Sequence, residues 1–217
     1  MQSGTRPLSI IPILLVTIVL TQILYIVKST YKIEIPSSAV WSLEAVAFLA
    51  IAVLALVAML QKGALALAWA AIAMGSLLNV LQVGMGLTMF APLSDAGEAL
   101  VPVYEAVVAA AFYLYFAGKI LFGFAAVVAG MTLLRNTGSA RVAGALAAVA
   151  GLAAIVVNLG GIVVGMPWLY AAGATGTLAT LLLALALRMC GRDLAHSPDG
   201  LRVTFTQTDY QSPPVAP

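Results

Sequence analysis

Residues 39–61 read AVWSLEAVAFLAIAVLALVAMLQ, an apolar stretch in which Glu44 is the only charged residue. A membrane-spanning α-helix needs about 20 such residues to cross a hydrocarbon core of about 30 Å. Further apolar stretches of the same character occupy residues 8–27, 64–90, 99–134, 142–166 and 168–187. Short polar segments rich in turn-forming residues separate them. The sequence therefore predicts an all-α membrane protein, a bundle of six transmembrane helices.

The overall composition supports this class of protein. Hydrophobic residues make up 63% of the chain and charged residues 8%, and the mean hydropathy is +1.08. Such a chain has too little polar surface to cover a water-soluble globule, so membrane lipids are its expected surroundings. The net charge of +2 is small, and Lys and Arg form no cluster with interleaved aromatic residues. We therefore expect no nucleic-acid partner.

The stretch 99–134 is too long for one helix that crosses the membrane at a right angle. About 36 residues at 1.5 Å each would reach more than 50 Å. Pro102 predicts a division into a short interfacial segment at 98–103 and a long fourth transmembrane helix. The aromatic run at 112–116 is typical of the boundary between lipid and water, which places the hydrocarbon-spanning part at about 114–134.

Two units of unequal size follow from these segments. Residues 1–190 are expected to form the six-helix transmembrane domain, and residues 191–217 are polar and rich in Pro. The second segment is predicted to be a largely disordered cytoplasmic tail. The apolar run at 8–27 is followed by no small-x-small cleavage site, so it is interpreted as an uncleaved first helix.

The distribution of basic residues predicts the orientation of the bundle. With six helices both termini share one face, and that face collects Arg6, Lys62, Arg135, Arg141, Arg188, Arg192 and Arg202. The opposite face has Lys28 and Lys32. Because short cytoplasmic loops carry an excess of Lys and Arg, both termini are expected in the cytoplasm. The predicted location is the plasma (inner) membrane of a cell, with multiple passes.

Polar side chains within the apolar stretches are the candidate functional residues, because burying them in a bilayer is costly. Depth along the helices places most of them in the half away from the basic face. The candidate ligand-binding residues are Glu44, Asn79, Gln82, Glu105, Lys119 and Asn158. Gln22 and Thr175 lie at similar depth. The hypothesis is a polar pocket that opens towards the outer side of the membrane.

Lys119 is the sharpest of these candidates, because an ammonium within a helix span needs an acceptor. Glu44 is the expected carboxylate partner, since Glu105 precedes Lys119 on the same helix by about 21 Å. Alternatively, Lys119 extends past Tyr115 towards the lipid headgroups, because helical side chains lean towards the N-terminus.

The amide candidates have a second interpretation as contacts between helices. Asn79 and Gln82 share one helix face and could bind a ligand headgroup or a neighbouring helix. Asn158 precedes Gly161 and Gly165, whose spacing favours close helix packing.

Metal, cofactor and nucleophile chemistry have no signature in the chain. His196 is the only histidine and Cys190 the only cysteine, so the chain alone supplies no zinc, haem or copper ligand set and no disulfide. We expect no cofactor and assign no catalytic residue.

These observations favour a non-enzymatic multi-pass membrane protein, a subunit or accessory protein of a membrane complex. Its partners would be other transmembrane subunits or further copies of the chain. The alternative is a binder or transporter of a small amphipathic or lipid-like molecule, which uses the outer polar pocket. A third possibility is an intramembrane enzyme with Glu44 or Glu105 as acid/base beside Lys119, but no motif supports it.

Overall fold

The computed structural model describes residues 6–61 and 65–196, and within this part every regular element is helical. Six helical segments are long and apolar enough to cross a membrane, which confirms the predicted all-α fold with six long apolar helices. The α-helices are α1 (Arg6–Tyr31), α2 (Ser37–Gln61), α3 (Ala66–Met85), α4 (Ala91–Asp95), α5 (Val101–Leu133), α6 (Gly138–Val164) and α7 (Leu169–His196). Three short helices join them: η2 (Gly86–Phe90), η3 (Glu98–Leu100) and η4 (Met166–Trp168).

The third long apolar segment is longer than the sequence indicated. A π-helical turn, η2, connects α3 to α4, and together they form the segment Ala66–Asp95. The polar segment that the sequence places after residue 90 is therefore helical as far as Asp95, and Pro92 lies in the α-helical turn that directly follows the π-helical η2. The chain reverses only after α4, where Gly97 has a φ of 86° that favours glycine.

Pro102 likewise fails to divide the fourth segment where expected. It lies in the first turn of α5, so the 33 residues of this helix run unbroken from Val101. The separate short segment is η3 alone, and the predicted interfacial segment at 98–103 is wrong in its second half. At 1.5 Å per residue, α5 is about 50 Å long and exceeds the thickness of a hydrocarbon core.

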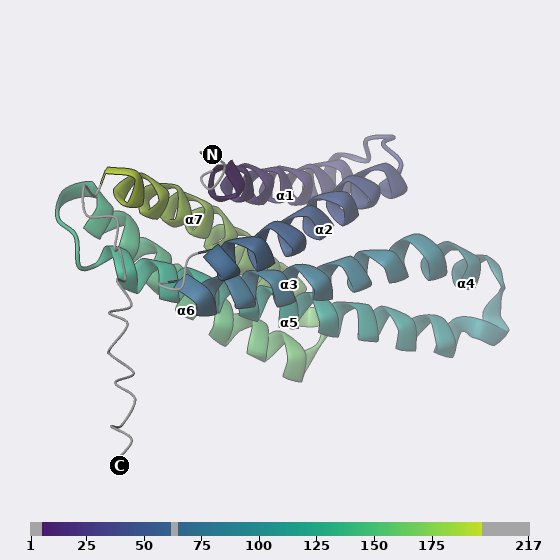
Figure 1. The fold of residues 1–217 in the computed structure, drawn as a ribbon. Helices are drawn as coiled ribbons and strands as arrows, with labels where there is room; N and C mark the ends of the chain where they lie inside the picture. Colours follow the sequence, from purple (N-terminus) through teal and green to yellow (C-terminus); the bar gives the residue numbers. More distant parts are fainter. Residues whose placement is uncertain (1–5, 62–64, 197–217) are drawn as a thin grey trace, which may run out of the picture.

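The helices form a closed bundle (Figure 1). α1 packs against α2 and α7, α2 packs against α3, and α5 contacts α3, α6 and α7. The start of α1 and the end of α7 lie at the same end of the bundle, whereas α4 and the start of α5 extend past the α6–α7 turn at the other end (Figure 1). α7 continues beyond its predicted end at 187, and the expected turn at 62–63 and most of the expected tail lie outside the described residues.

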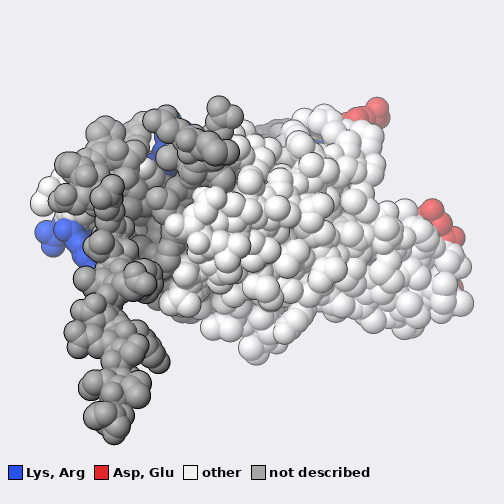
Figure 2. Space-filling view, viewed as in Figure 1, with Lys and Arg blue, Asp and Glu red and all other residues white. Residues whose placement is uncertain are grey.

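Charge is distributed asymmetrically along the bundle. Figure 2 shows acidic side chains at the end that holds α4 and the α1–α2 connection, and basic side chains at the opposite end. This agrees with the separation of charge that the sequence indicates between the two faces.

Small residues allow α5 and α6 to approach closely. A Cβ atom at Gly151 would lie 2.5 Å from the carbonyl oxygen of Gly123, and one at Gly144 would lie 2.7 Å from that of Gly130. Association of helices in lipid depends on such van der Waals contact, because lipid tails are as apolar as the side chains. The α5–α6 interface is therefore specified by backbone proximity at these two pairs of glycines.

Replacement of Gly151 by Ala should destabilise the bundle by about 1–3 kcal/mol, because the added methyl group meets the backbone of α5. Thermal unfolding of the purified chain in one detergent measures this as a lower Tm. Gly84→Ala is the matched control, since a Cβ atom there meets nothing within 4 Å. Equal Tm values for the two variants would contradict the close α5–α6 contact.

Candidate functional site

Lys119 lies inside the bundle and has no exposed surface. Its aliphatic chain runs against α7 at Gly176, where a Cβ atom would lie 2.7 Å from Lys119 Cδ. Glycine at this position therefore makes room for the buried side chain. The alternative in which Lys119 extends to the lipid headgroups does not occur in this structure.

One amide oxygen accepts hydrogen bonds from two other helices. Lys119 Nζ on α5 donates to Gln22 Oε1 on α1 over 2.9 Å, and Thr177 Oγ1 on α7 donates to the same oxygen over 2.7 Å. The ammonium also lies 5.4 Å from the centroid of the Tyr115 ring, within the range of a cation–π interaction. Gln22 thus connects α1, α5 and α7 at a single point.

Glu44 lies beside this point but has a different partner. The side chain is 8% exposed, and Glu44 Oε1 accepts a hydrogen bond of 2.8 Å from Thr21 Oγ1. Thr21 and Gln22 are neighbours on α1, so the two interactions share one turn of that helix. The expected direct contact between Glu44 and Lys119 does not form among the described residues; the ammonium donates to Gln22 instead.

Asn79 in α3 and Asn158 in α6 make the same kind of hydrogen bond. Both are buried, and each donates from Nδ2 to the carbonyl oxygen four residues earlier, that of Gly75 over 2.7 Å and that of Ala154 over 2.8 Å. Asn158 also reaches the carbonyl oxygen of Ala172 on α7 over 3.3 Å. The two amide nitrogens therefore bind carbonyl oxygens of their own helices inside the bundle.

The small residues near these amides serve contacts of different kinds. A Cβ atom at Gly118 of α5 would clash with the Asn79 amide, and one at Gly161 would lie 2.9 Å from the Phe116 ring. Gly161 therefore packs as its spacing indicates, whereas Gly165 has a φ of 80° and ends α6. The Asn79 amide of α3 thus meets α5 at Gly118, and Gly161 of α6 meets the Phe116 ring of α5, close to Lys119.

We call the buried and half-buried polar side chains at this level the polar core. Its members are Thr21, Gln22, Glu44, Asn79, Lys119, Asn158 and Thr177. Four of the six predicted ligand-binding residues belong to it. Glu105 does not, because it is exposed on the first turns of α5. Gln82 is half-buried like Gln22, but no hydrogen bond in the described structure joins its side chain to the other members.

The residues that sequence reasoning left out of the candidate set are Thr21, Gln22 and Thr177. Gln22 has the expected depth, but only the contact between α1 and α7 brings it to Lys119. The hydroxyls of the two threonines could bind backbone carbonyl oxygens of their own helices, so a threonine in the sequence does not by itself indicate a contact between helices. Their role depends on which helices are neighbours.

Hydrogen bonding is the chemistry that the polar core can offer. It combines one amine, one carboxylate, three amides and two hydroxyls, and the described residues contain no group of three or more His, Cys, Asp or Glu that could hold a metal ion. Four buried polar atoms have no partner in the described structure: Trp69 Nε1, Ser76 Oγ, Asn79 Oδ1 and Asn158 Oδ1. The ammonium of Lys119 therefore has an acceptor, whereas the side-chain oxygens of Asn79 and Asn158 have no donor in the described structure.

Comparison with known proteins finds no matching family model, no matching curated protein and no matching solved structure. The interpretation of this chain therefore depends on its own residues.

Gln22→Leu should destabilise the protein by about 1.5–3 kcal/mol, because it leaves the buried ammonium of Lys119 without its acceptor. Adding Lys119→Met to Gln22→Leu should restore much of this loss, because the unpaired charge is removed. Unfolding of the single and double variants in one detergent measures the interaction free energy between Gln22 and Lys119. Glu105→Gln is an exposed control and should have no effect.

If the double variant were no more stable than Gln22→Leu, the interaction between Gln22 and Lys119 would not contribute to the stability of the bundle.

Proposed function

We propose that the protein is a non-enzymatic, multi-pass integral membrane protein that acts as a subunit or accessory protein of a membrane complex. The observation that carries this proposal is that side chains of the polar core form hydrogen bonds with one another. The ammonium of Lys119 and the hydroxyl of Thr177 both bind Gln22, and the carboxylate of Glu44 binds Thr21. Hydrogen bonds of this kind connect transmembrane helices, a structural role that requires no substrate.

Because the polar core lies inside the bundle, the exposed outer faces of the helices are the surfaces that can contact partners. On α6 they carry Val149, Val156 and Val163, which are 66%, 67% and 85% exposed. These β-branched side chains follow one another at intervals of seven residues, so they lie along one face of the helix. A stiff apolar face is suited to van der Waals packing against another transmembrane helix.

Extraction of the tagged full chain with a mild detergent, followed by native mass spectrometry, tests this function. We expect a complex of fixed stoichiometry with a second membrane polypeptide or with further copies of the chain. Val156→Trp should weaken the complex through the altered α6 face, whereas Val53→Trp on α2, also exposed, is the control. A monomer that is free of other polypeptides in several mild detergents would contradict the proposal.

A second candidate function is the binding or transport of a small amphipathic molecule. The unpaired buried oxygens of Asn79 and Asn158 favour it, because buried acceptors without a donor are costly and a ligand with N–H or O–H groups would satisfy them. In the same mass spectra, this function would appear as a small-molecule adduct on the monomer. The adduct should be lost in Asn79→Leu and Asn158→Leu variants and retained in Glu105→Gln.

We further propose that the chain lies in the plasma membrane with both termini in the cytoplasm, as the basic end of the bundle suggests. Single cysteines placed at exposed Ser29 and Ser139, in a chain with Cys190→Ser, test the orientation. A membrane-impermeant maleimide applied to intact cells should label the Ser29→Cys chain and not the Ser139→Cys chain. Labelling of Ser139→Cys alone would show the opposite orientation.

A further inference from the structure

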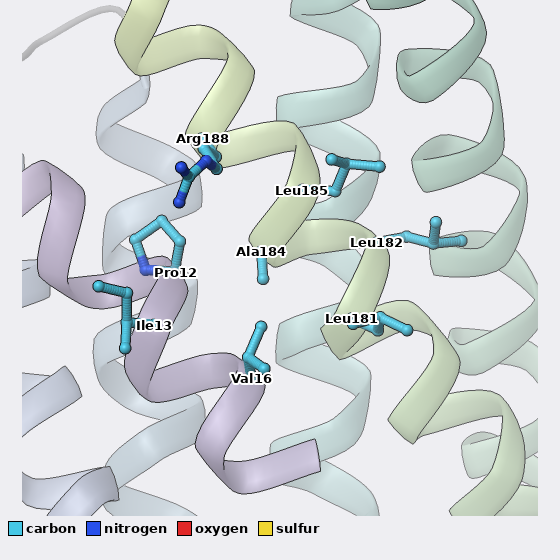
Figure 3. A pocket seen from close by; sticks show the side chains of 8 residues that line it. All are labelled: Pro12, Ile13, Val16, Leu181, Leu182, Ala184, Leu185 and Arg188. Atoms are coloured by element: carbon cyan, nitrogen blue, oxygen red, sulfur yellow. The ribbon is translucent and has the colours of Figure 1, made fainter. Parts of the chain in front are cut away.

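An open groove of about 550 Å³ runs between α1 and α7. Its volume is in the range of about 300–1,000 Å³ that small-molecule sites have. The residues that line it are Pro12, Ile13, Val16, Leu181, Leu182, Ala184, Leu185 and Arg188. They come from the first half of α1 and the second half of α7 (Figure 3), so the groove lies towards the end of the bundle that holds the start of α1 and the end of α7 (Figure 1).

The lining of the groove has two chemically distinct parts. Seven of its eight residues are apolar, and the eighth is Arg188. Figure 3 shows the guanidinium of Arg188 beside Pro12 at one end of the groove, with Val16 and Leu181 at the other end. This arrangement fits a ligand with an apolar chain and an anionic head.

The groove is open to the surroundings of the bundle. Ile13, Val16 and Leu181 are 58%, 37% and 41% exposed, and they lie on helices long and apolar enough to cross a membrane. An occupant would therefore enter sideways, from the bilayer. Arg188 is also exposed, near the end of α7 where the basic side chains gather. A guanidinium at that depth is placed to meet phosphate groups, which it binds through two parallel hydrogen bonds.

We propose that this groove binds an anionic phospholipid. One acyl chain lies along Ile13, Val16 and Leu181, and the phosphate accepts hydrogen bonds from Arg188. The apolar lining excludes a soluble anion, and the cation at its end selects an anionic over a zwitterionic lipid. Because α1 and α7 are the first and last helices of the bundle and pack against each other, the lipid contacts both of them at once.

Native mass spectrometry of the purified full chain with added lipid tests this proposal. The probes are dioleoyl phosphatidylglycerol and dioleoyl phosphatidylcholine, which share their acyl chains and differ in headgroup charge. We expect the phosphatidylglycerol adduct to dominate and to fall about fivefold in Arg188→Gln. Arg141→Gln is the matched control, an exposed arginine at the basic end that does not line the groove, and it should leave the adduct unchanged.

A second pair of variants tests the position of the acyl chain. Val16→Trp should fill the groove and reduce the adducts of both lipids, whereas Val53→Trp, at an exposed position on α2, should not. Equal binding of the two lipids to the original chain, or equal losses in Arg188→Gln and Arg141→Gln, would overturn the proposal. Neither result bears on whether the chain has polypeptide partners, so the proposed function stands or falls separately.

Discussion

The hydrogen bonds to Gln22 Oε1 are the interaction on which the arrangement of the bundle depends. A lysine ammonium without exposed surface requires an acceptor, and the amide oxygen of Gln22 supplies it at 2.9 Å while also accepting from Thr177. The three side chains belong to α1, α5 and α7, which lie far apart in the sequence. The first helix is therefore joined to the last one and to the central α5 by one polar contact in an apolar interior.

Small residues make this contact possible. Gly176 leaves the space that the Lys119 side chain occupies, and Gly118 does the same for the Asn79 amide. One turn further along α5, Gly123 and Gly151 bring α6 to backbone distance. The lack of side-chain volume at these glycines thus fixes both the position of α5 and the direction in which Lys119 extends.

The sequence predicts the coarse structure because hydrophobicity and length alone determine which segments can cross a membrane. It also predicts that Glu44, Asn79, Lys119 and Asn158 lie at a common depth, and the structure buries all four. Their role in ligand binding stays a prediction. The α4 helix and the unbroken start of α5 were missed, because Pro92 and Pro102 are typical of helix breaks, whereas Pro92 follows a π-helical turn and Pro102 lies in the first turn of α5.

The partner of Lys119 could not be predicted for a different reason. Gln22 and Glu44 are both at suitable depth, and the choice between them depends on the contact of α1 with α7, which local sequence does not encode. A density map of the purified full chain that resolves side chains tests the account most directly. The account predicts continuous contact between Lys119 and Gln22, with no other molecule between α1, α5 and α7. Non-protein density that separates these two side chains, or a Lys119 side chain turned towards lipid, would contradict it.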